Sequence, residues 1–265
     1  MALGIAPNRT RARALILAGR ILVDDVPVDK AGASVRSDAE IRLKGELPRF
    51  VSRGGEKLEG ALVDFGLDVG GLRCLDVGAS TGGFSDCLLQ RGAAAVVAVD
   101  VGRGQLHERL RQDPRVRSLE RTNVRALDAA QIGEAVDLVV IDVSFISLRQ
   151  VLPAVVRVAG GAPVLALVKP QFEVGRERVG KGGVVRDDRL RAEAVDGIGS
   201  FVAGLGYREA GRSESRIAGP RGNREVFLWL ERVSPGAVVR AGLVPATRED
   251  DGASDEGSGD PRATR

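Results

Sequence analysis

The chain has 265 residues, enough to bury a sizeable core and to form one large or two modest domains. With only two cysteines, Cys74 and Cys87, and a single histidine, its composition argues against a disulfide framework and against a zinc site. No apolar run approaches the roughly 18 residues that span a bilayer, and the N-terminus lacks a signal-peptide core, so we predict a cytoplasmic protein with no membrane segment and no metal.

The net charge of +3 is distributed unevenly along the chain. Between Met1 and Arg20 there are four arginines and no acidic residue, whereas between Arg248 and Arg265 there are six acidic residues and three arginines. A basic N-terminal segment indicates an anionic partner, for which nucleic acid is the natural candidate. The alternative is a solvated arginine face without a partner, and charge alone leaves it open.

The first part of the chain predicts a small module of one helix and short strands. The predicted helix and strands are, in chain order, 11–17, 21–23, 26–28 and 34–43. Glycine and proline between Lys44 and Pro48 indicate a linker, so we place the first domain at 1–47.

Strands and helices then alternate. The predicted strands are 72–77, 93–100, 117–122, 137–143, 164–169, 207–217 and 225–233, and the predicted helices are 52–65, 84–89, 148–158 and 187–205. Apolar runs without alternation, such as Leu138–Ile141, are typical of parallel strands covered on both faces. A hairpin connection at 218–223 makes the final strand antiparallel to its neighbour. We therefore predict an α/β domain at 48–233 with a doubly wound, mostly parallel sheet and one antiparallel strand.

Two segments fall outside this alternation. The stretch 171–185 holds four glycines and several charges, and we expect a flexible segment over the strand ends that acts as a lid. From 234 to 265 the chain is rich in Gly, Ser, Asp and Arg, and we expect a disordered tail.

A glycine-rich loop follows the first strand of the second domain, between Leu75 and Phe84. Phe84 stands where a phosphate-binding P-loop needs lysine, and the glycine order does not fit the dinucleotide fingerprint. The pattern Asp-x-Gly-x-x-x-Gly-Gly resembles the S-adenosylmethionine loop of Rossmann-like methyltransferases; a purely structural glycine turn is the alternative. The predicted cofactor-binding residues of the loop are Gly78, Ala79, Ser80, Thr81, Gly82 and Gly83.

Two polar residues beyond this loop extend the predicted cofactor site. Asp100 ends the second strand at the interval where a nucleotide-like ribose is held by its hydroxyls. Asn123, after the third strand, is placed near an adenine-like group. A solvated strand-end aspartate and an ordinary loop asparagine are the respective alternatives.

Four charged residues are predicted to meet at one sheet edge. Asp142 and Lys169 end parallel strands, Glu225 begins a strand of opposite direction, and Lys57 lies near the start of the helix before the first strand. Charged residues that converge beside a cofactor loop indicate catalysis, because neighbouring lysines and carboxylates shift one another's pKa values and that of an acceptor hydroxyl. A strand-end network of salt bridges is the alternative.

The N-terminal module carries Arg11, Ala14 and Leu17 at helical spacing, followed by Gly19-Arg20-Ile21-x-Val23 and Val26-x-Val28-x-Lys30. This pattern resembles the RNA-binding domain named after ribosomal small-subunit protein four. In that domain an arginine-bearing helix and the loop after it meet the RNA backbone, which implies RNA contacts for Arg11, Arg13 and Arg20. The family's first helix should precede Ala6, where only a few residues remain, so the module is expected to be truncated at its N-terminus.

The second domain contains Val168-Lys169-Pro170-Gln171-Phe172-Glu173 and Gly222-Asn223-Arg224-Glu225 in addition to the glycine loop and Lys57. With these motifs it resembles the TlyA family, whose FtsJ-like domain methylates ribose. It implies 2′-O-methylation of ribosomal RNA, at cytidine, with S-adenosylmethionine as cofactor and ribosomal RNA or ribosomal subunits as partner. The implied catalytic and RNA-contacting residues of this domain are Lys57, Asp142, Lys169, Glu225 and Arg53.

Other activities fit less well. A base N-methyltransferase would carry an Asn/Asp-Pro-Pro-aromatic motif where Asp142-Val143-Ser144-Phe145 stands. A pyrimidine carbon methyltransferase needs a cysteine nucleophile. Cys74 and Cys87 are instead expected to be small buried hydrophobes. Two alternatives remain open: a catalytically silent RNA-binding protein and, because family members carry the label haemolysin, a membrane-active protein.

Overall fold

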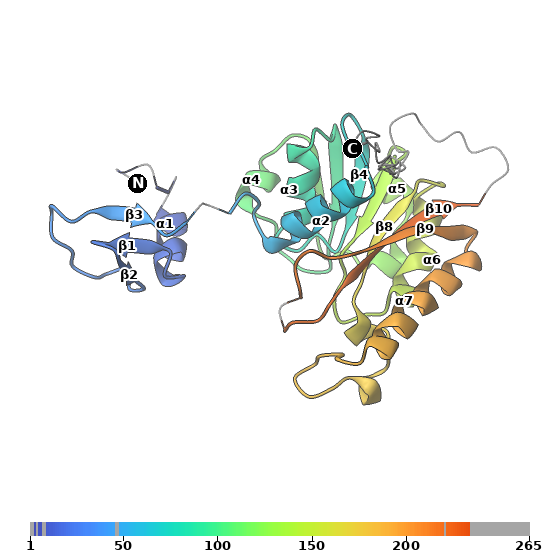
Figure 1. Ribbon diagram of the computed structural model, residues 1–265. Coiled ribbons are helices and arrows are strands. Elements are labelled where there is room, and N and C mark those ends of the chain that lie inside the picture. The colour runs from blue at the N-terminus through green and yellow to red at the C-terminus, as the bar shows by residue number, and fades with distance from the viewer. Residues whose placement is uncertain (1–2, 4, 7–8, 46–47, 220, 234–265) are drawn as a thin grey trace, which may run out of the picture. The chain divides into compact units, whose positions relative to one another are not determined.

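The chain divides into two compact units, one ending at Arg49 and one beginning at Phe50. The computed structural model describes residues 3, 5–6, 9–45, 48–219 and 221–233, so the predicted disordered tail lies outside the described residues (Figure 1).

The first unit is a three-stranded antiparallel sheet with one helix. Its elements are α1 (Arg9–Leu17), β1 (Ile21–Val23), β2 (Val26–Val28) and β3 (Ile41–Leu43), in the sheet order β2-β1-β3. Asp24 and Asp25 both adopt positive φ, the backbone that a two-residue hairpin turn between twisted strands requires. The strand predicted over 34–43 is wrong except for its last three residues, because only these pair with β1.

The second unit contains a seven-stranded sheet in the order β6-β5-β4-β7-β8-β10-β9. Its strands are β4 (Arg73–Val77), β5 (Ala95–Val99), β6 (Val116–Leu119), β7 (Leu138–Ile141), β8 (Val164–Val168), β9 (Tyr207–Glu214) and β10 (Val226–Arg232). Neighbouring strands from β6 to β8 are parallel, and β10 is antiparallel to both β8 and β9. The predicted α/β class, with a mostly parallel sheet and one antiparallel strand, is therefore confirmed.

Helices cover both faces of this sheet. They are α2 (Arg53–Asp64), α3 (Gly83–Gln90), α4 (Glu108–Arg111), α5 (Ala129–Ile132), α6 (Leu148–Val158) and α7 (Asp188–Ala203), with 3₁₀ turns η1 (Val124–Ala126), η2 (Pro170–Phe172) and η3 (Arg176–Arg178). In Figure 1, α2, α3 and α4 lie on one face and α6 and α7 on the other. Strand β8 contributes side chains to the hydrophobic core on each face of the sheet. Leu165 and Leu167 pack on the side of α2 and α3, and Val164, Ala166 and Val168 pack on the side of α6 and α7.

The sheet order brings several strand ends to one edge. Strand β4 lies between β5 and β7, so the chain leaves it at the point where strand order reverses, which is where ligands bind in open α/β sheets. Val226, the first residue of β10, pairs with Val168, the last of β8. Glu225 and Lys169 are therefore neighbours at the same edge, although one begins its strand and the other ends its own.

Candidate active site

The glycine loop after β4 lies in close contact with the end of β7. Gly78 has φ of +88°, and a Cβ there would lie 2.5 Å from the carbonyl oxygen of Asp142. Gly82 has φ of +94°, and a Cβ there would lie 2.2 Å from Cδ1 of Leu110. At Gly78 the near atom belongs to the backbone, so glycine is required there for the close approach as well as for the backbone conformation; at Gly82 the near atoms are ends of leucine side chains, and the positive φ is the reason for glycine.

Asp100 binds the backbone in the middle of this loop, at Ser80. Its carboxylate accepts hydrogen bonds from the backbone N–H groups of Ser80 at 2.8 Å and Gly102 at 2.7 Å. It lines a small hollow that shares Ala79 and Ser80 with the main cleft. Asp100 thus lies beside the loop, as the spacing predicts. The exposed Asn123 is not brought to either hollow: its Oδ1 accepts from the N–H of Arg125 and caps η1.

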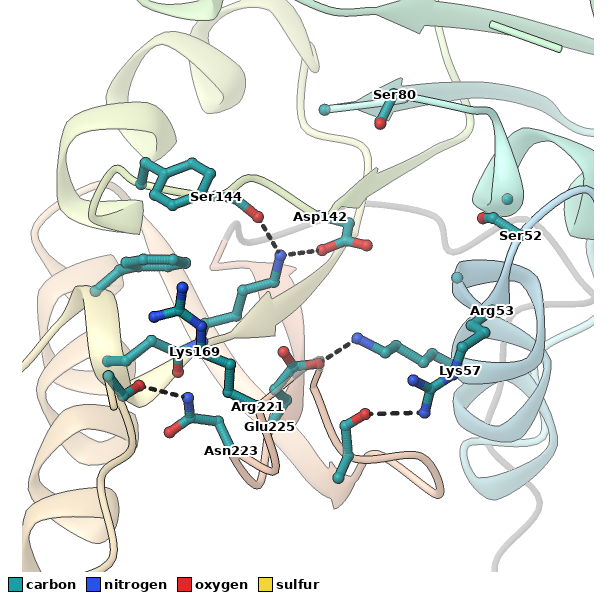
Figure 2. A pocket seen from close by; sticks show the side chains of 18 of the residues that line it. Ser52, Arg53, Lys57, Ser80, Asp142, Ser144, Lys169, Arg221, Asn223 and Glu225 are labelled. Carbon is teal, nitrogen blue, oxygen red and sulfur yellow. Dashed lines mark hydrogen bonds and ion pairs between the residues drawn. The ribbon is translucent and has the colours of Figure 1, made fainter. Parts of the chain in front are cut away.

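A cleft of about 1060 Å³ opens beside the loop (Figure 2). Residues from α2, the glycine loop, the ends of β7 and β8, segment 171–183 and the hairpin before β10 surround it. The lining includes Ser52, Arg53, Lys57, Gly78, Ala79, Ser80, Thr81, Gly83, Asp142, Ser144, Phe145, Lys169, Phe172, Arg176, Gly180, Gly183, Arg221, Asn223 and Glu225. Of the predicted site residues, the four charged ones and most of the loop therefore share one cavity.

Lys169 projects from the end of β8 and meets the end of β7. Its Nζ lies 2.6 Å from Oδ1 of Asp142 and donates a hydrogen bond of 2.8 Å to Oγ of Ser144. The residue is 8% exposed and lines the cleft.

Lys57 and Glu225 form a second ion pair in the same cavity. Nζ of Lys57 lies 2.5 Å from Oε2 of Glu225, and both residues are buried, at 7% and 1% exposure. Lys57 comes from the first turns of α2 and Glu225 from the residue before β10 (Figure 2). Because each carboxylate is paired with a lysine, the buried charges compensate one another.

The lining as a whole carries excess positive charge. It contains five cations, Arg53, Lys57, Lys169, Arg176 and Arg221, and only two carboxylates. Arg53 donates to the carbonyl of Ala218 and Arg221 to that of Gly182, contacts that leave their charge uncompensated. The cleft is therefore suited to an anionic molecule.

An exposed aromatic residue was not singled out from the sequence. Phe145 follows Ser144 at the cleft, is 91% exposed and has φ of +65°, a conformation that is uncommon for a bulky residue. Its ring centroid lies 5.4 Å from that of Phe172. The only sequence signal is an aromatic residue three positions after the strand-end aspartate.

Asn223 is a second residue that the sequence did not assign. It is 3% exposed, its Oδ1 accepts from the N–H of Val185 at 3.0 Å, and its Nδ2 donates to the carbonyl of Gly183 at 2.8 Å. With a backbone bridge between Gly180 and Val184, these contacts give the predicted lid segment a defined path along the cleft. Its movement as a lid stays a prediction.

Buried carboxyl groups flank the site. Burial raises the pKa of Asp76 to about 7, although Ser85 donates to its Oδ2 from both N–H and Oγ. Within the described part of the chain, Oδ1 of Asp76 has no hydrogen-bond partner. Burial also raises the pKa of Glu173, whose oxygens accept from Oγ of Ser147 and the N–H of Leu148 at the start of α6.

The two cysteines are fully buried, and neither forms a disulfide. Burial raises the pKa of Cys74 to about 12, which suppresses the thiolate. The expectation that both behave as small buried hydrophobes is confirmed.

The predicted RNA-contacting arginines occupy different positions. Arg13 is exposed on α1, and Arg20 donates to the carbonyl of Lys44 at 3.0 Å. Arg11 belongs to α1, but its side chain lies outside the described residues. Arg53 is the member of this set that lines the cleft.

The sheet order, the loop at the switch point and the adjoining cleft define a Rossmann-like methyltransferase. Residues 50–232 match the FtsJ-like methyltransferase family, and residues 1–41 match the S4 domain. The chain belongs to the FtsJ-like methyltransferases and, among them, to the TlyA family, as the sequence motifs imply.

Three similar proteins illustrate this membership. The 16S/23S rRNA (cytidine-2'-O)-methyltransferase TlyA of Mycobacterium tuberculosis is 49% identical over 92% of this chain and 91% of its own. Hemolysin A of Brachyspira hyodysenteriae is 40% identical over 84% of this chain and 93% of its own. A solved structure, described as a putative hemolysin from Streptococcus thermophilus, is 41% identical with a TM-score of 0.71, covering 91% of this chain and 89% of that one.

Among the described residues, no helix is both long and apolar enough to cross a bilayer. The same residues contain no group of three or more His, Cys, Asp and Glu side chains placed to hold a metal ion.

Proposed function

We propose that the protein transfers a methyl group from S-adenosylmethionine to the 2′-hydroxyl of a ribose in ribosomal RNA, with cytidine as the acceptor nucleoside. The observation that carries this proposal is the convergence of two lysine–carboxylate pairs and the glycine loop on one cleft. A relative that is 49% identical bears the name of a 16S/23S rRNA (cytidine-2'-O)-methyltransferase, which supports both the reaction and the substrate.

The cavity is suited to S-adenosylmethionine. Its volume of about 1060 Å³ exceeds the 300–1,000 Å³ usual for a single small ligand, so it has room for a cofactor and part of an acceptor. We assign the cofactor to the loop from Gly78 to Gly83, with Asp100 facing the ribose hydroxyls. We assign Asn123, whose Oδ1 also caps η1, to the side of the adenine. When bound, the cofactor supplies an electrophilic methyl group on a sulfonium sulfur.

The four charged residues have distinct proposed roles. Lys169, as the amine, accepts the proton of the 2′-hydroxyl, and Asp142 orients it. The ammonium of Lys57 stabilises negative charge that develops on the acceptor oxygen, and Glu225 fixes the position of that ammonium. Holding the hydroxyl in line with the methyl group contributes further, because orientation alone lowers a barrier by about 7–11 kcal/mol.

The acceptor side of the cleft suits RNA. Arg53, Arg176 and Arg221 present guanidinium groups to a phosphodiester backbone, and the exposed ring of Phe145 offers a face on which an unstacked base can lie. We assign a second RNA surface to the first domain, through Arg11, Arg13 and Arg20, consistent with its match to the S4 domain. A ribosomal substrate also implies the cytoplasmic location that the sequence predicts.

The domain organisation follows from the same proposal. We assign RNA binding to residues 1–47 and methyl transfer to residues 48–233, a division supported by the two compact units and by the family match over 50–232.

The test is methyl transfer from radiolabelled S-adenosylmethionine to isolated 30S and 50S subunits, followed by mass spectrometry of the nucleosides. We expect label in 2′-O-methylcytidine with the wild type. Lys169→Ala should lower the rate by about 100- to 10,000-fold while calorimetry shows retained cofactor binding. Ribosome binding without transfer by the wild type would favour a silent RNA-binding protein, and cofactor-independent leakage of liposomes would favour a membrane-active one.

A further inference from the structure

The hydroxyl of Ser144 is the second protein group that holds the Lys169 side chain. Nζ of Lys169 donates to Oγ of Ser144 at 2.8 Å, while Oδ1 of Asp142 lies 2.6 Å from the same nitrogen (Figure 2). Asp142 and Ser144 are two positions apart in the segment that follows β7, so one short stretch of chain supplies both contacts.

The residue after Ser144 in this stretch, Phe145, makes a contact of its own. Phe145 adopts φ of +65°, and its ring packs against Phe172, which lies in the 3₁₀ turn directly after Lys169. The aromatic contact joins the segment that carries Ser144 to the segment that carries Lys169. The segments that carry the serine and the lysine therefore also touch through these two rings.

Two contacts on one nitrogen define a direction. A neutral lysine amine has two N–H bonds and one lone pair in a roughly tetrahedral arrangement, and rotation about its Cε–Nζ bond is otherwise free. The hydrogen bond to Ser144 takes up one N–H bond, and the carboxylate of Asp142, an ion-pair partner whose Oδ1 accepts no hydrogen bond within the described residues, attracts the other by its charge. The lone pair then points along the remaining direction. Lys169 lines the cleft, which is the side from which an acceptor hydroxyl can approach its nitrogen.

We propose that Ser144 is a positioning residue for methyl transfer: with Asp142, it aims the lone pair of Lys169 at the acceptor hydroxyl. This inference rests on the proposed function. In the step concerned, the proton of the 2′-hydroxyl moves to Nζ of Lys169, the oxygen keeps the electron pair and forms the new bond to the methyl carbon, and the carbon–sulfur bond breaks with its electrons on sulfur. Ser144 accepts a hydrogen bond before and after the step and loses no proton.

A different role for Ser144 would be direct contact with RNA, since the residue is exposed at the cleft. The two roles differ in their kinetics. A contact made equally in the ground and transition states changes KM, whereas misdirection of Lys169 changes kcat.

The experiment compares Ser144→Ala, Ser144→Thr and the control Ser213→Ala with the wild type. Ser213 makes a hydroxyl hydrogen bond of similar length, 2.7 Å to Asp64, and is not a cleft residue. Steady-state methylation of ribosomal subunits gives kcat and KM, and calorimetry gives cofactor affinity. We expect Ser144→Ala to lower kcat about 10- to 100-fold, because the amine becomes an ammonium during the step and its hydrogen bond to Ser144 then becomes one to a charged group, with KM and cofactor Kd within about twofold.

Threonine keeps the hydroxyl, and its extra methyl group has space because position 144 is exposed, so Ser144→Thr should recover most of kcat. Ser213→Ala should match the wild type. Unchanged kcat in Ser144→Ala, an effect on KM alone, or a threonine variant as slow as the alanine variant would overturn the inference. Absence of transfer by the wild type itself would instead overturn the proposed function.

Discussion

Lys57 and Glu225 are 168 positions apart in the chain, yet their charged atoms lie 2.5 Å from each other. Lys57 lies near the start of α2, the helix before β4, and Glu225 directly precedes the last strand, β10. The pair joins the beginning and end of the methyltransferase unit inside the cleft. Its removal should therefore affect the stability of the fold as well as the reaction.

We expect Lys57→Met to lower the free energy of unfolding by about 3–5 kcal/mol, because the carboxylate of Glu225 then remains buried without its cation. The double variant Lys57→Met/Glu225→Gln should lose less than the two single variants added together. Denaturant unfolding measures all three. The exposed pair Arg178–Glu193 serves as control, and Glu193→Gln should cost less than about 1 kcal/mol. A Lys57→Met variant as stable as this control would contradict the prediction.

Asp76 should make the stability depend on pH. Its pKa of about 7 in the fold lies above the ordinary value of 3.8, so the native state holds a proton that the unfolded chain has released between these values. The free energy of unfolding should then fall as pH rises from about 4 to about 7, by at most about 1.4 kcal/mol per unit from this group.

Asp76→Asn is the matched variant, since its amide oxygen can still accept from Ser85. Urea unfolding at pH 5, 6, 7 and 8 should show a stability difference, wild type minus variant, that declines with pH and levels off above about 7. A difference that stays constant or rises over this range would show that the carboxyl is not held protonated.

The sequence predicted those parts of the site that depend on strand direction. Asp142 and Lys169 end parallel strands, and Glu225 begins the strand of opposite direction, so topology alone brings them to one edge. Helix α6 was predicted at its observed bounds, and in the structure Ser147 caps it through a hydrogen bond to a residue two positions away, which is a local relation. By contrast, α4 and α5 were missed, since helices of four residues are too short to show a period.

Contacts made by side chains across distant segments were not predictable in this way. The hydrogen bond from Lys169 to Ser144 depends on side-chain conformation, and the two bonds from Asn223 depend on the path of a glycine-rich segment with no regular period. Phe145 lacked a signal because a single aromatic residue after a strand is usually part of the core.

Arg221 should contribute to RNA affinity without selecting sequence. Its guanidinium lines the cleft and donates a hydrogen bond to the carbonyl of Gly182. We expect Arg221→Gln to weaken binding to methylation-competent and unrelated RNAs alike and to reduce the slope of log K against log salt by about 1. Filter binding from 50 to 300 mM salt measures this slope. Arg189→Gln, an exposed arginine outside the cleft lining, should leave it unchanged.

Asn223 should hold the segment along the cleft against proteolysis. Its two hydrogen bonds reach Gly183 and the buried Val185, and basic residues that trypsin recognises, Arg178, Lys181 and Arg186, flank or interrupt this stretch. Asn223→Ala leaves the N–H of Val185 and the carbonyl of Gly183 without these partners, which should cost about 1–3 kcal/mol locally.

Since proteolysis of a native protein follows the population of its opened segment, this cost predicts cleavage between 176 and 186 that is about 5- to 160-fold faster in Asn223→Ala. Limited trypsin digestion with mass spectrometry of the fragments measures the rate at each site. Asn123→Ala, which removes an exposed asparagine that caps η1, should digest there at the wild-type rate. If Asn223→Ala is cut no faster than this control, the hydrogen bonds of Asn223 do not limit opening, and the segment is held by the packing of Val174 and Val185 against α7.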